Sequence, residues 1–392
     1  MPPLLTIDEA RAKVLGAIVP LGAEEVAVGD ALGRVLAEDV AAAHDIPSFP
    51  NSAMDGFALR AGPPGRVLRI VGESRAGAPA AVAVGEDEAV RISTGAAVPD
   101  GADAVLPIEE AEVDGDAVRA VAGVAAGDHL RAPGEDLRAG DTVLRAGTPL
   151  GPAELGIAVE AGRATVRCAA VPRVAVLATG DELVDPGEPL AHGQLHNSNA
   201  ITLAAQARRA GARVVRSAAV RDDPDATREA IAGALEAADL LLLTGGVSVG
   251  PHDHVKPALT ALGVEEVFWR VALRPGKPVW FGTRDGTVVF GLPGNPVSAM
   301  VTFALFARPA LAALQGAPAA PPRGRAVLAA PVPRQRTREE AVRVRLAGDR
   351  ATPTGPQGSH QLFSMVGADA LAIVPRGEGE LPAGTEVEIE RL

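Results

Sequence analysis

The 392-residue chain is too long for one ordinary hydrophobic core, so it is expected to fold into two to four domains. Hydrophobic residues make up 47% of it and charged residues 22%, a balance that indicates a folded protein and excludes a largely disordered chain. The formal net charge of −12 makes nucleic acid a poor main partner, because duplex binding depends on clustered Lys and Arg.

The first 170 residues are predicted to form short strands and two helices. Residues 6–19 have a helical pattern, with Thr6 as the N-cap and Glu9 three residues further on, which is the arrangement of a capping box. Short β-type runs separated by turn residues lie between 67 and 150 and indicate a small β domain. A second helix is expected over 152–160.

Strands and helices alternate from residue 171 onward. The run RVAVLAT at 173–179 is continuously apolar, as in a strand buried on both faces, and DLLLLT at 239–244 repeats the pattern. The other expected elements are a helix at 199–210, a strand at 213–220, a helix that begins at Pro224 behind an Asp223 cap, a hairpin around Asp285-Gly286, and an apolar helix from Asn295-Pro296 to about Leu314. This alternation predicts a doubly wound α/β domain with a mostly parallel sheet.

A linker rich in Ala and Pro occupies 316–324, and the short β-type runs after it indicate a small C-terminal β domain. Cys168 is the one cysteine, so neither an intramolecular disulfide nor a cysteine-based metal site is expected. The N-terminus lacks the basic start and long apolar core of a signal peptide, and no run of about 18 consecutive strongly apolar residues occurs. A cytoplasmic protein without a membrane span is therefore expected.

Three loops leave the carboxyl ends of predicted strands, where ligands bind in open α/β sheets. They are TGDEL at 179–183, TGGVSVGPHDH at 244–254 and LPGNP at 292–296. The second loop is neither a Walker A motif nor GxGxxG. Its glycines would let backbone N–H groups approach an anion closely, so it is interpreted either as a phosphate cradle or as a tight strand-to-helix turn.

Charged side chains cluster on and beside these loops. Glu182 and Asp253 are either solvated acids or ligands of a Mg²⁺ ion that bridges to a phosphate. His252 and His254 flank Asp253, but adjacent side chains in extended backbone point apart, which disfavours a zinc-type site. Cations near the same domain are expected either to be solvated or to contact an anionic ligand; they are Lys256, Arg274 and Lys277.

Eight segments, in this order, resemble the molybdopterin molybdenumtransferase family, the MoeA type that also occurs as the gephyrin E domain. They are PSFPNSAMDGFALR (47–60), RISTGAAVPDGADAVLPIEE (91–110), RAPGEDLRAG (131–140), VAVLATGDELV (174–184), TGGVSVGPHDHVK (244–256), RPGKPVWFG (274–282), FGLPGNPVSA (290–299) and GSHQLFSMVGADAL (358–371). Their number and order make the resemblance specific.

The resemblance implies an enzyme that takes adenylylated molybdopterin and molybdate, inserts molybdenum into the dithiolene, and releases molybdenum cofactor and AMP with Mg²⁺ as the cofactor. It also implies a homodimer with the cleft between subunits, and transient contacts with a MogA-type adenylyltransferase and with acceptor molybdoenzymes. No nucleic-acid or membrane partner is expected.

The fold that the resemblance implies is multidomain, α/β plus β. Its expected parts are an elongated linking domain at 1–26, 41–53 and 141–170, a small β-rich domain at 27–40 and 54–140, a MogA-like doubly wound α/β domain at 171–318, and a barrel-like β domain at 319–392.

Functional residues follow from the resemblance by motif match. Catalytic roles are expected for Asp55, Thr94, Asp136 and Glu182, and metal binding for Asp55, Glu182 and Asp253. The implied substrate-binding set is Asp222, Thr244, Gly245, Gly246, Ser248, Gly250, Arg274, Lys277, Pro293, Gly294, Asn295, Pro296 and Ser359.

Three alternatives stay open at this point. A non-catalytic scaffold that kept the pterin pocket, as in the receptor-clustering use of this domain in gephyrin, would be favoured by loss of the loop acids, which are present. An enzyme that adenylylates molybdopterin would need only the α/β domain, so the first 165 residues and the final β domain count against it. Tungstate is a tetrahedral dianion of nearly the same size as molybdate, so insertion of tungsten is the third alternative.

Overall fold

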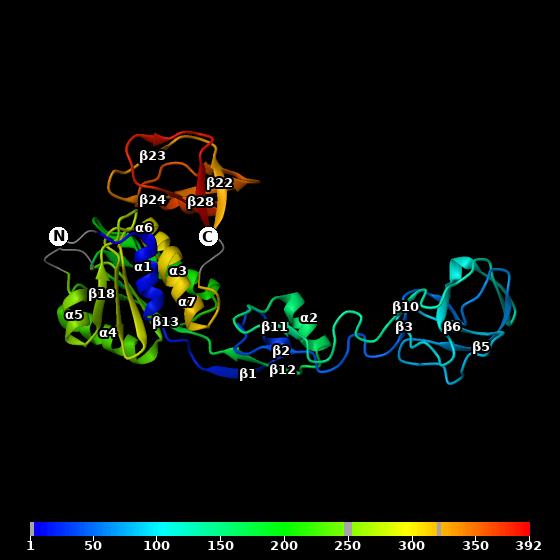
Figure 1. Ribbon diagram of the computed structural model, residues 1–392. Coiled ribbons are helices and arrows are strands. Elements are labelled where there is room, and N and C mark those ends of the chain that lie inside the picture. The colour runs from blue at the N-terminus through cyan, green and yellow to red at the C-terminus, as the bar shows by residue number, and fades with distance from the viewer. Residues whose placement is uncertain (1–3, 247–252, 320–322) are drawn as a thin grey trace.

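The computed structural model describes residues 4–246, 253–319 and 323–392, and the chain is elongated (Figure 1). An α/β unit and a C-terminal β unit lie together at one end of the molecule, a distal β unit lies at the other end, and a linking unit joins them. These four names stand for the following residues: the α/β unit for 7–16 and 173–314, the C-terminal β unit for 324–391, the distal β unit for 51–131, and the linking unit for 23–41 and 142–169.

The α/β unit is built on a six-stranded sheet of order β16-β13-β17-β21-β20-β18, in which the first four strands are parallel, β20 is antiparallel to β21, and β18 is antiparallel to β20. This confirms the predicted doubly wound, mostly parallel arrangement. The strands are β13 (Arg173–Thr179), β16 (Arg213–Val220), β17 (Leu240–Thr244), β18 (Glu265–Trp269), β20 (Trp280–Arg284) and β21 (Thr287–Leu292), with the short pair β14 (Leu183–Val184) and β15 (Leu195–His196) beyond the sheet.

Helices cover both faces of this sheet, which explains why β13 and β17 are continuously apolar. Along β17, Leu240 and Leu242 pack into the core on one face, whereas Leu241 and Leu243 pack into the core on the other. The first face is covered by α1 (Ile7–Gly16), α3 (Ser198–Arg209), α6 (Pro296–Thr302), a π-helical turn (Phe303–Ala307) and α7 (Arg308–Leu314). The second face is covered by α4 (Pro224–Ala237) and α5 (Val255–Ala261).

The structure confirms the predicted N-terminal caps of two helices. Thr6 and Glu9 form the predicted capping box at the start of α1, and the Asp223 side chain accepts a hydrogen bond from the Ala226 N–H at the start of α4. The run Pro296–Leu314 is long and apolar enough to cross a membrane, with a mean hydropathy of 1.7. Because 78% of it is buried inside the molecule, it is packed as the core helix of a globular unit.

The C-terminal β unit is a closed barrel. Strand β24 pairs with both β25 and β26, and the ring closes through β22 and β28. Strand β19 (Leu273–Arg274) of the α/β unit adds to β24 in parallel. The strands of this unit are β22 (Gly324–Leu328), β23 (Val332–Pro333), β24 (Glu339–Ala347), β25 (Arg350–Pro353), β26 (Ala370–Val374), β27 (Glu380–Leu381) and β28 (Glu386–Arg391), with a 3₁₀ turn at Leu362–Met365.

The linking unit consists of two short strand pairs and the helix α2 (Pro152–Glu160), which has the predicted bounds. Its pairs are β1 (Ala23–Ala27) with β12 (Thr165–Ala169) and β2 (Val40–Ala41) with β11 (Thr142–Leu144). The distal unit has a sheet of order β7-β4-β6-β5-β9-β8 and the pair β3 (Asn51–Ser52) with β10 (Leu130–Arg131). The sheet strands are β4 (Gly56–Leu59), β5 (Val67–Ser74), β6 (Glu88–Ile92), β7 (Ala104–Pro107), β8 (Ala111–Asp114) and β9 (Ala117–Ala120).

The division of the chain at the expected domain bounds stays a prediction, and two segments pack differently from it. Helix α1, expected in the linking domain, buries Ile7 and Val14 in the core of the α/β unit. Residues 28–40, expected in the small β-rich domain, pack with Leu150 and Cys168 of the linking unit. In both cases, the segment packs in a hydrophobic core with residues that are far from it in sequence.

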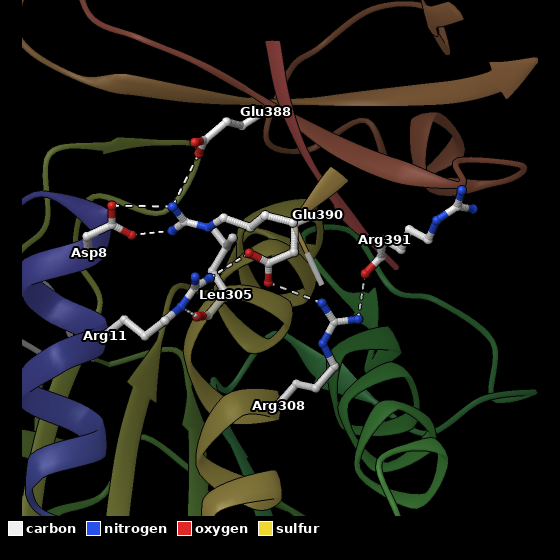
Figure 2. A network of polar contacts seen from close by, with 8 residues as sticks. Asp8, Arg11, Leu305, Arg308, Glu388, Glu390 and Arg391 are labelled. Carbon is white, nitrogen blue, oxygen red and sulfur yellow. Dashed lines mark hydrogen bonds and ion pairs between the residues drawn. The ribbon is translucent and has the colours of Figure 1, made fainter. Parts of the chain in front are cut away.

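A buried ionic network fastens the C-terminal β unit to the α/β unit (Figure 2). Glu390 of β28 is 1% exposed; it accepts a hydrogen bond from Arg11 Nη2 of α1 at 2.6 Å and one from Arg308 Nη2 of α7 at 3.1 Å. Arg11 Nε also donates to the Leu305 carbonyl at 3.1 Å, in the π-helical turn. Arg323 reaches both Asp8 and Glu388 at the exposed rim of the same junction. One carboxylate therefore joins three segments that are far apart in sequence.

We predict that Glu390→Gln lowers the free energy of unfolding of the α/β unit by about 3 kcal/mol, because two arginines lose their buried counter-charge. Urea unfolding followed by tryptophan fluorescence measures this directly, since Trp269 and Trp280, the two tryptophans of the chain, both lie in the α/β unit. Glu386→Gln is the matched control on the same strand: its partner Arg325 is exposed, so a change of at most about 0.5 kcal/mol is expected. Equal effects of the two substitutions would contradict the prediction.

Candidate functional site

A cavity of about 710 Å³ opens at the carboxyl edge of the parallel strands. The chain leaves β13 for β16 on one side and later returns to β17 on the other side, so the cavity lies at the point where the winding direction reverses. It is lined by Ala178, Thr179, Glu182, Leu183, Leu190, Leu195, His196, Asn197, Ser198, Asn199, Thr244, Gly245, Gly294, Asn295, Pro296 and His360. Described residues of the three loops expected to converge meet here, the second loop being represented by Thr244 and Gly245.

Asn199, near the start of α3, ties two strand ends together at the cavity. Its Nδ2 donates to Thr244 Oγ1 at 2.9 Å and to the Gly294 carbonyl at 2.7 Å, and Thr244 Oγ1 donates to the Pro293 carbonyl at 3.1 Å. The Oδ1 of Asn199 and the Oγ1 of Thr179 are buried and have no hydrogen-bond partner within the described ranges. Buried polar atoms of native proteins are nearly always paired, so these two are suited to contact a polar ligand.

The glycines after β17 allow a close approach of two backbone segments. Gly245 has a φ of +86°, and a Cβ there would lie 2.5 Å from the Thr179 carbonyl oxygen. Gly246 has a φ of +58°, with Val255 Cγ2 at 2.8 Å from such a Cβ. The tight turn alone therefore explains why glycine occupies both positions. The expected ligands Ser248 and Gly250 lie outside the described residues.

The C-terminal β unit supplies one wall of the cavity. Ser359 Oγ accepts a hydrogen bond from Asn295 Nδ2 at 3.1 Å, and the Ser359 carbonyl accepts one from the Val297 N–H at 3.1 Å. His360, the next residue, lines the cavity itself. The predicted Ser359 is thus brought to the start of α6 although the two lie in different units.

Two predicted acids lie at the ends of β13 and β16. Glu182 lines the cavity, and its carboxylate folds back over Gly180, where an added Cβ would meet it at 2.5 Å. The N–H of Asp222 donates to Asp181 Oδ1 at 3.1 Å, which fixes Asp222 at the same edge of the sheet but outside the cavity lining.

Asp253 precedes α5 with its carboxylate buried. Neither oxygen accepts a hydrogen bond that meets normal geometry in the part of the chain that the structure describes. Burial raises the pKa of this carboxyl. The charge of Lys256 and the backbone N–H groups of Lys256 and Val255 act in the opposite direction and lower the pKa. Lys256 Nζ lies 3.1 Å from the centre of the Trp269 ring, and burial lowers the pKa of this lysine.

A buried carboxylate that accepts no hydrogen bond of normal geometry from the described residues fits one ligand of a divalent cation. Among residues 4–246, 253–319 and 323–392, however, no three side chains of His, Cys, Asp or Glu come together as a complete metal site. The donors present therefore fit Mg²⁺ only if a substrate phosphate and water complete its coordination, as is common for this ion.

The two predicted cations lie at the junction of the α/β and C-terminal units rather than in the cavity wall. Arg274 pairs with Glu340 in the backbone ladder, and its Nη1 lies 3.7 Å from Glu340 Oε1. Lys277 is exposed, and its carbonyl accepts a hydrogen bond from the Val271 N–H.

The remaining predicted residues lie outside this end of the molecule. In the distal β unit, Asp55 Oδ1 accepts hydrogen bonds from the Thr94 N–H at 2.7 Å and from Thr94 Oγ1 at 3.2 Å. Asp136 lies where the distal and linking units meet, and its N–H donates to the Ile46 carbonyl. Figure 1 places the distal unit at the opposite end of the chain from the sheet that carries the cavity. The candidate residues therefore form two groups within one chain.

Sequence reasoning did not identify Thr179, Asn199 or His360 as site residues. The signal for Asn199 was present, because HNSNA places two asparagines at the start of a helix that follows the loop after β13. His360 directly follows the predicted Ser359, whereas the unpaired hydroxyl of Thr179 depends on the approach of Gly245 and had no sequence signal.

The architecture and the cavity define a multidomain α/β protein with a polar cavity at a sheet edge. The chain matches three family models: the MoeA N-terminal region (domain I and II) over 5–162, a probable molybdopterin binding domain over 175–313, and the MoeA C-terminal region (domain IV) over 325–392. The chain belongs to the MoeA family.

Individual relatives match over nearly the whole chain. A molybdopterin molybdenumtransferase of Haemophilus influenzae is 35% identical over 398 residues, covering 99% of this chain and 98% of the relative. Molybdopterin molybdenumtransferase 2 of Mycobacterium tuberculosis is 39% identical, covering 93% and 94%. The crystal structure of the molybdopterin biosynthesis moeA protein from Pyrococcus horikoshii is similar with a TM-score of 0.86 at 29% identity, covering 99% of this chain and 100% of that one.

We predict that Gly245→Ala lowers the free energy of unfolding by about 1–3 kcal/mol, because a Cβ would meet the Thr179 carbonyl in a left-handed backbone conformation. Gly294→Ala is the control in the same cavity: its Cβ would find no atom closer than 3.7 Å, so a change within about 0.5 kcal/mol is expected. Urea unfolding measures both. A tolerated Gly245→Ala would show that the close approach at the cavity floor is not required.

Proposed function

We propose that this protein is a molybdopterin molybdenumtransferase that inserts molybdate into adenylylated molybdopterin and releases molybdenum cofactor and AMP. The observation that carries the proposal is the cavity at the sheet edge, whose wall combines the Glu182, Thr244 and Asn295 loops with His360 of the C-terminal unit. Unpaired Thr179 Oγ1 and Asn199 Oδ1 would hydrogen-bond the pterin. The names of the Haemophilus and Mycobacterium relatives support the same reaction.

Charge at the unit junction would favour the anionic substrates. Arg274 and Lys277 would offset the negative charge of molybdate and of the substrate phosphates, which bare carboxylates alone would repel. Mg²⁺, held by Asp253 with Glu182 and a substrate phosphate, would supply further positive charge at the phosphate. Asp55, Asp136 and Thr94 would act in molybdate handling or proton transfer, and the hydrogen bonds from Thr94 would keep Asp55 oriented.

The separation of the two residue groups supports a homodimer with a shared site. The distal unit of one chain cannot serve the cavity of the same chain, since the linking unit holds them apart (Figure 1). In the proposed dimer, the Asp55 group of one subunit completes the cavity of the other. A cytoplasmic location and contacts with a MogA-type adenylyltransferase and with acceptor molybdoenzymes stay predictions.

The direct test of the function is an in vitro insertion assay with purified protein, adenylylated molybdopterin, Mg²⁺ and molybdate. We expect molybdate-dependent AMP release and activation of a cofactor-free molybdoenzyme, and we expect Asp55→Ala and Glu182→Ala to abolish both while the circular dichroism spectrum is retained. A parallel assay with tungstate in place of molybdate shows which of the two metals the protein inserts. Tight pterin binding without AMP release would contradict the enzyme and favour a scaffold.

Mixing the two inactive variants tests the shared site. A heterodimer of Asp55→Ala and Glu182→Ala chains has one site with both substitutions and one site with neither. After subunit exchange at equal concentrations, we expect recovery of about a quarter of wild-type activity, because half of the dimers are mixed and each has one intact site. A mixture that stays inactive, although mass spectrometry shows mixed dimers, would contradict sharing between subunits.

A further inference from the structure

Arg343, on β24 in the C-terminal β unit, is a charged side chain that is 0% exposed. Its Nε and Nη2 donate to Ser364 Oγ at 3.2 Å and 3.1 Å, and Nη2 also donates to the Gly358 carbonyl at 3.3 Å. Burial lowers the pKa of Arg343 to about 10, so the guanidinium is still charged at neutral pH. A buried cation is costly unless it is well paired, which calls for a reason for its presence.

The backbone of Arg343 binds the same loop as its side chain. The Arg343 N–H donates to Gln357 Oε1 at 2.9 Å, and the Arg343 carbonyl accepts from the Thr354 N–H at 3.0 Å and from Gln357 Nε2 at 3.3 Å. Thr354 Oγ1 in turn donates to the Ser364 carbonyl at 2.6 Å, which closes the two ends of the loop on each other. A single strand residue therefore holds the loop 354–364 at its start, in its middle and at its end.

This loop places His360 in the cavity lining and Ser359 against Asn295, which also lines the cavity. Its middle is held from one side by Arg343 through Gly358 and from the other side by Asn295 and Val297 of the α/β unit through Ser359. The loop has no regular secondary structure between Gln357 and Gln361. These contacts therefore fix it together with its own hydrogen bonds, in which Gly358 N–H donates to Gln361 Oε1 and Ser364 Oγ donates to the Gln361 carbonyl, both at 2.7 Å.

Glu340 is a second buried charged residue on the same strand, and its ion-pair partner is Arg274. It lies three residues before Arg343 on β24, is 4% exposed, and has one oxygen, Oε2, without a hydrogen-bond partner in the described part of the chain. Burial raises the pKa of Glu340, and the charges of Arg274, Arg343 and Arg338 oppose that shift. The charge of Arg343 thus favours the ionised form of Glu340, whereas the hydrogen bonds of the guanidinium go to Gly358 and Ser364 of the loop.

We propose that Arg343 is a positioning residue that holds the loop 354–364 in the conformation in which Ser359 and His360 can contact the anionic substrate. It touches neither the cavity nor the reacting atoms, and it acts through Gly358 and Ser364. This inference rests on the proposed function for the role of Ser359, but the position of the loop can be measured without any substrate.

The substrate-free test is hydrogen exchange at the Val297 N–H, which donates to the Ser359 carbonyl. Arg343→Met should increase its exchange rate about tenfold or more, since the acceptor is no longer held, whereas amides of the barrel strands β26 and β28 should keep their protection. Ser364→Ala keeps the guanidinium and its bond to the Gly358 carbonyl but removes the acceptor shared by Nε and Nη2, together with the bond from Ser364 Oγ to the Gln361 carbonyl, and a smaller increase at the same amide is expected. Unchanged exchange at Val297 in both variants would overturn the proposal.

The kinetic test separates positioning from loss of folded protein. With Arg343→Met, the KM for adenylylated molybdopterin should rise about tenfold or more while kcat changes less, because a displaced loop weakens binding. Arg343→Lys should recover part of the loss by keeping the charge, and Arg345→Met, on the same strand but exposed, should behave as wild type. A fall in kcat with unchanged KM would mean that only less protein folds, which would contradict positioning. If wild-type protein neither binds nor turns over the substrate, the proposed function fails, and the exchange experiment still decides the role of Arg343.

Discussion

The hydrogen-bond register of three parallel strands is the constraint on which the site depends. Ala178 of β13 pairs with Thr244 of β17, and Thr244 pairs with Leu292 of β21, so three segments that are far apart in sequence leave the sheet at the same level. Because the chain winds in opposite directions from β13, no crossover helix fills the space beyond this edge. Loops with glycines and prolines turn away there and leave a polar cavity.

The C-terminal barrel completes the cavity because it is fixed to the α/β unit at several places. Strand β19 joins the barrel through β24, and the buried carboxylate of Glu390 joins α1, α7 and β28. Both connections limit how far the Ser359 loop can move relative to the strand ends. Among the described residues, the distal unit lies at the far end of the molecule from these connections, which supports the idea that its acidic residues serve a second copy.

Local features were predictable from the sequence because their causes are local. Apolar runs identified β13 and β17, and Thr6 and Asp223 marked the starts of α1 and α4. The convergence of three strand-end loops followed from the parallel order that alternating elements imply. The family resemblance identified the acidic candidate residues, but it gave no information on the distances between them.

Interactions between distant segments were not predictable. In the alternating sequence AVRVRL, Arg343 has the pattern of a residue that points to solvent. The structure shows instead that it is buried and contacts the loop 354–364. The placement of α1 against the α/β core and the separation of Asp55 from Glu182 likewise depend on which hydrophobic faces meet. No composition or spacing rule contains that information.

The most direct test of the central claim is a crystal structure of the protein with molybdopterin bound. The account predicts pterin density in the cavity at the carboxyl edge of β13, β17 and β21, with hydrogen bonds to Thr179 and Asn199 and with the Asp55 group of a second subunit at its mouth. Pterin density at any other place, with this cavity unchanged and filled by solvent, would contradict it.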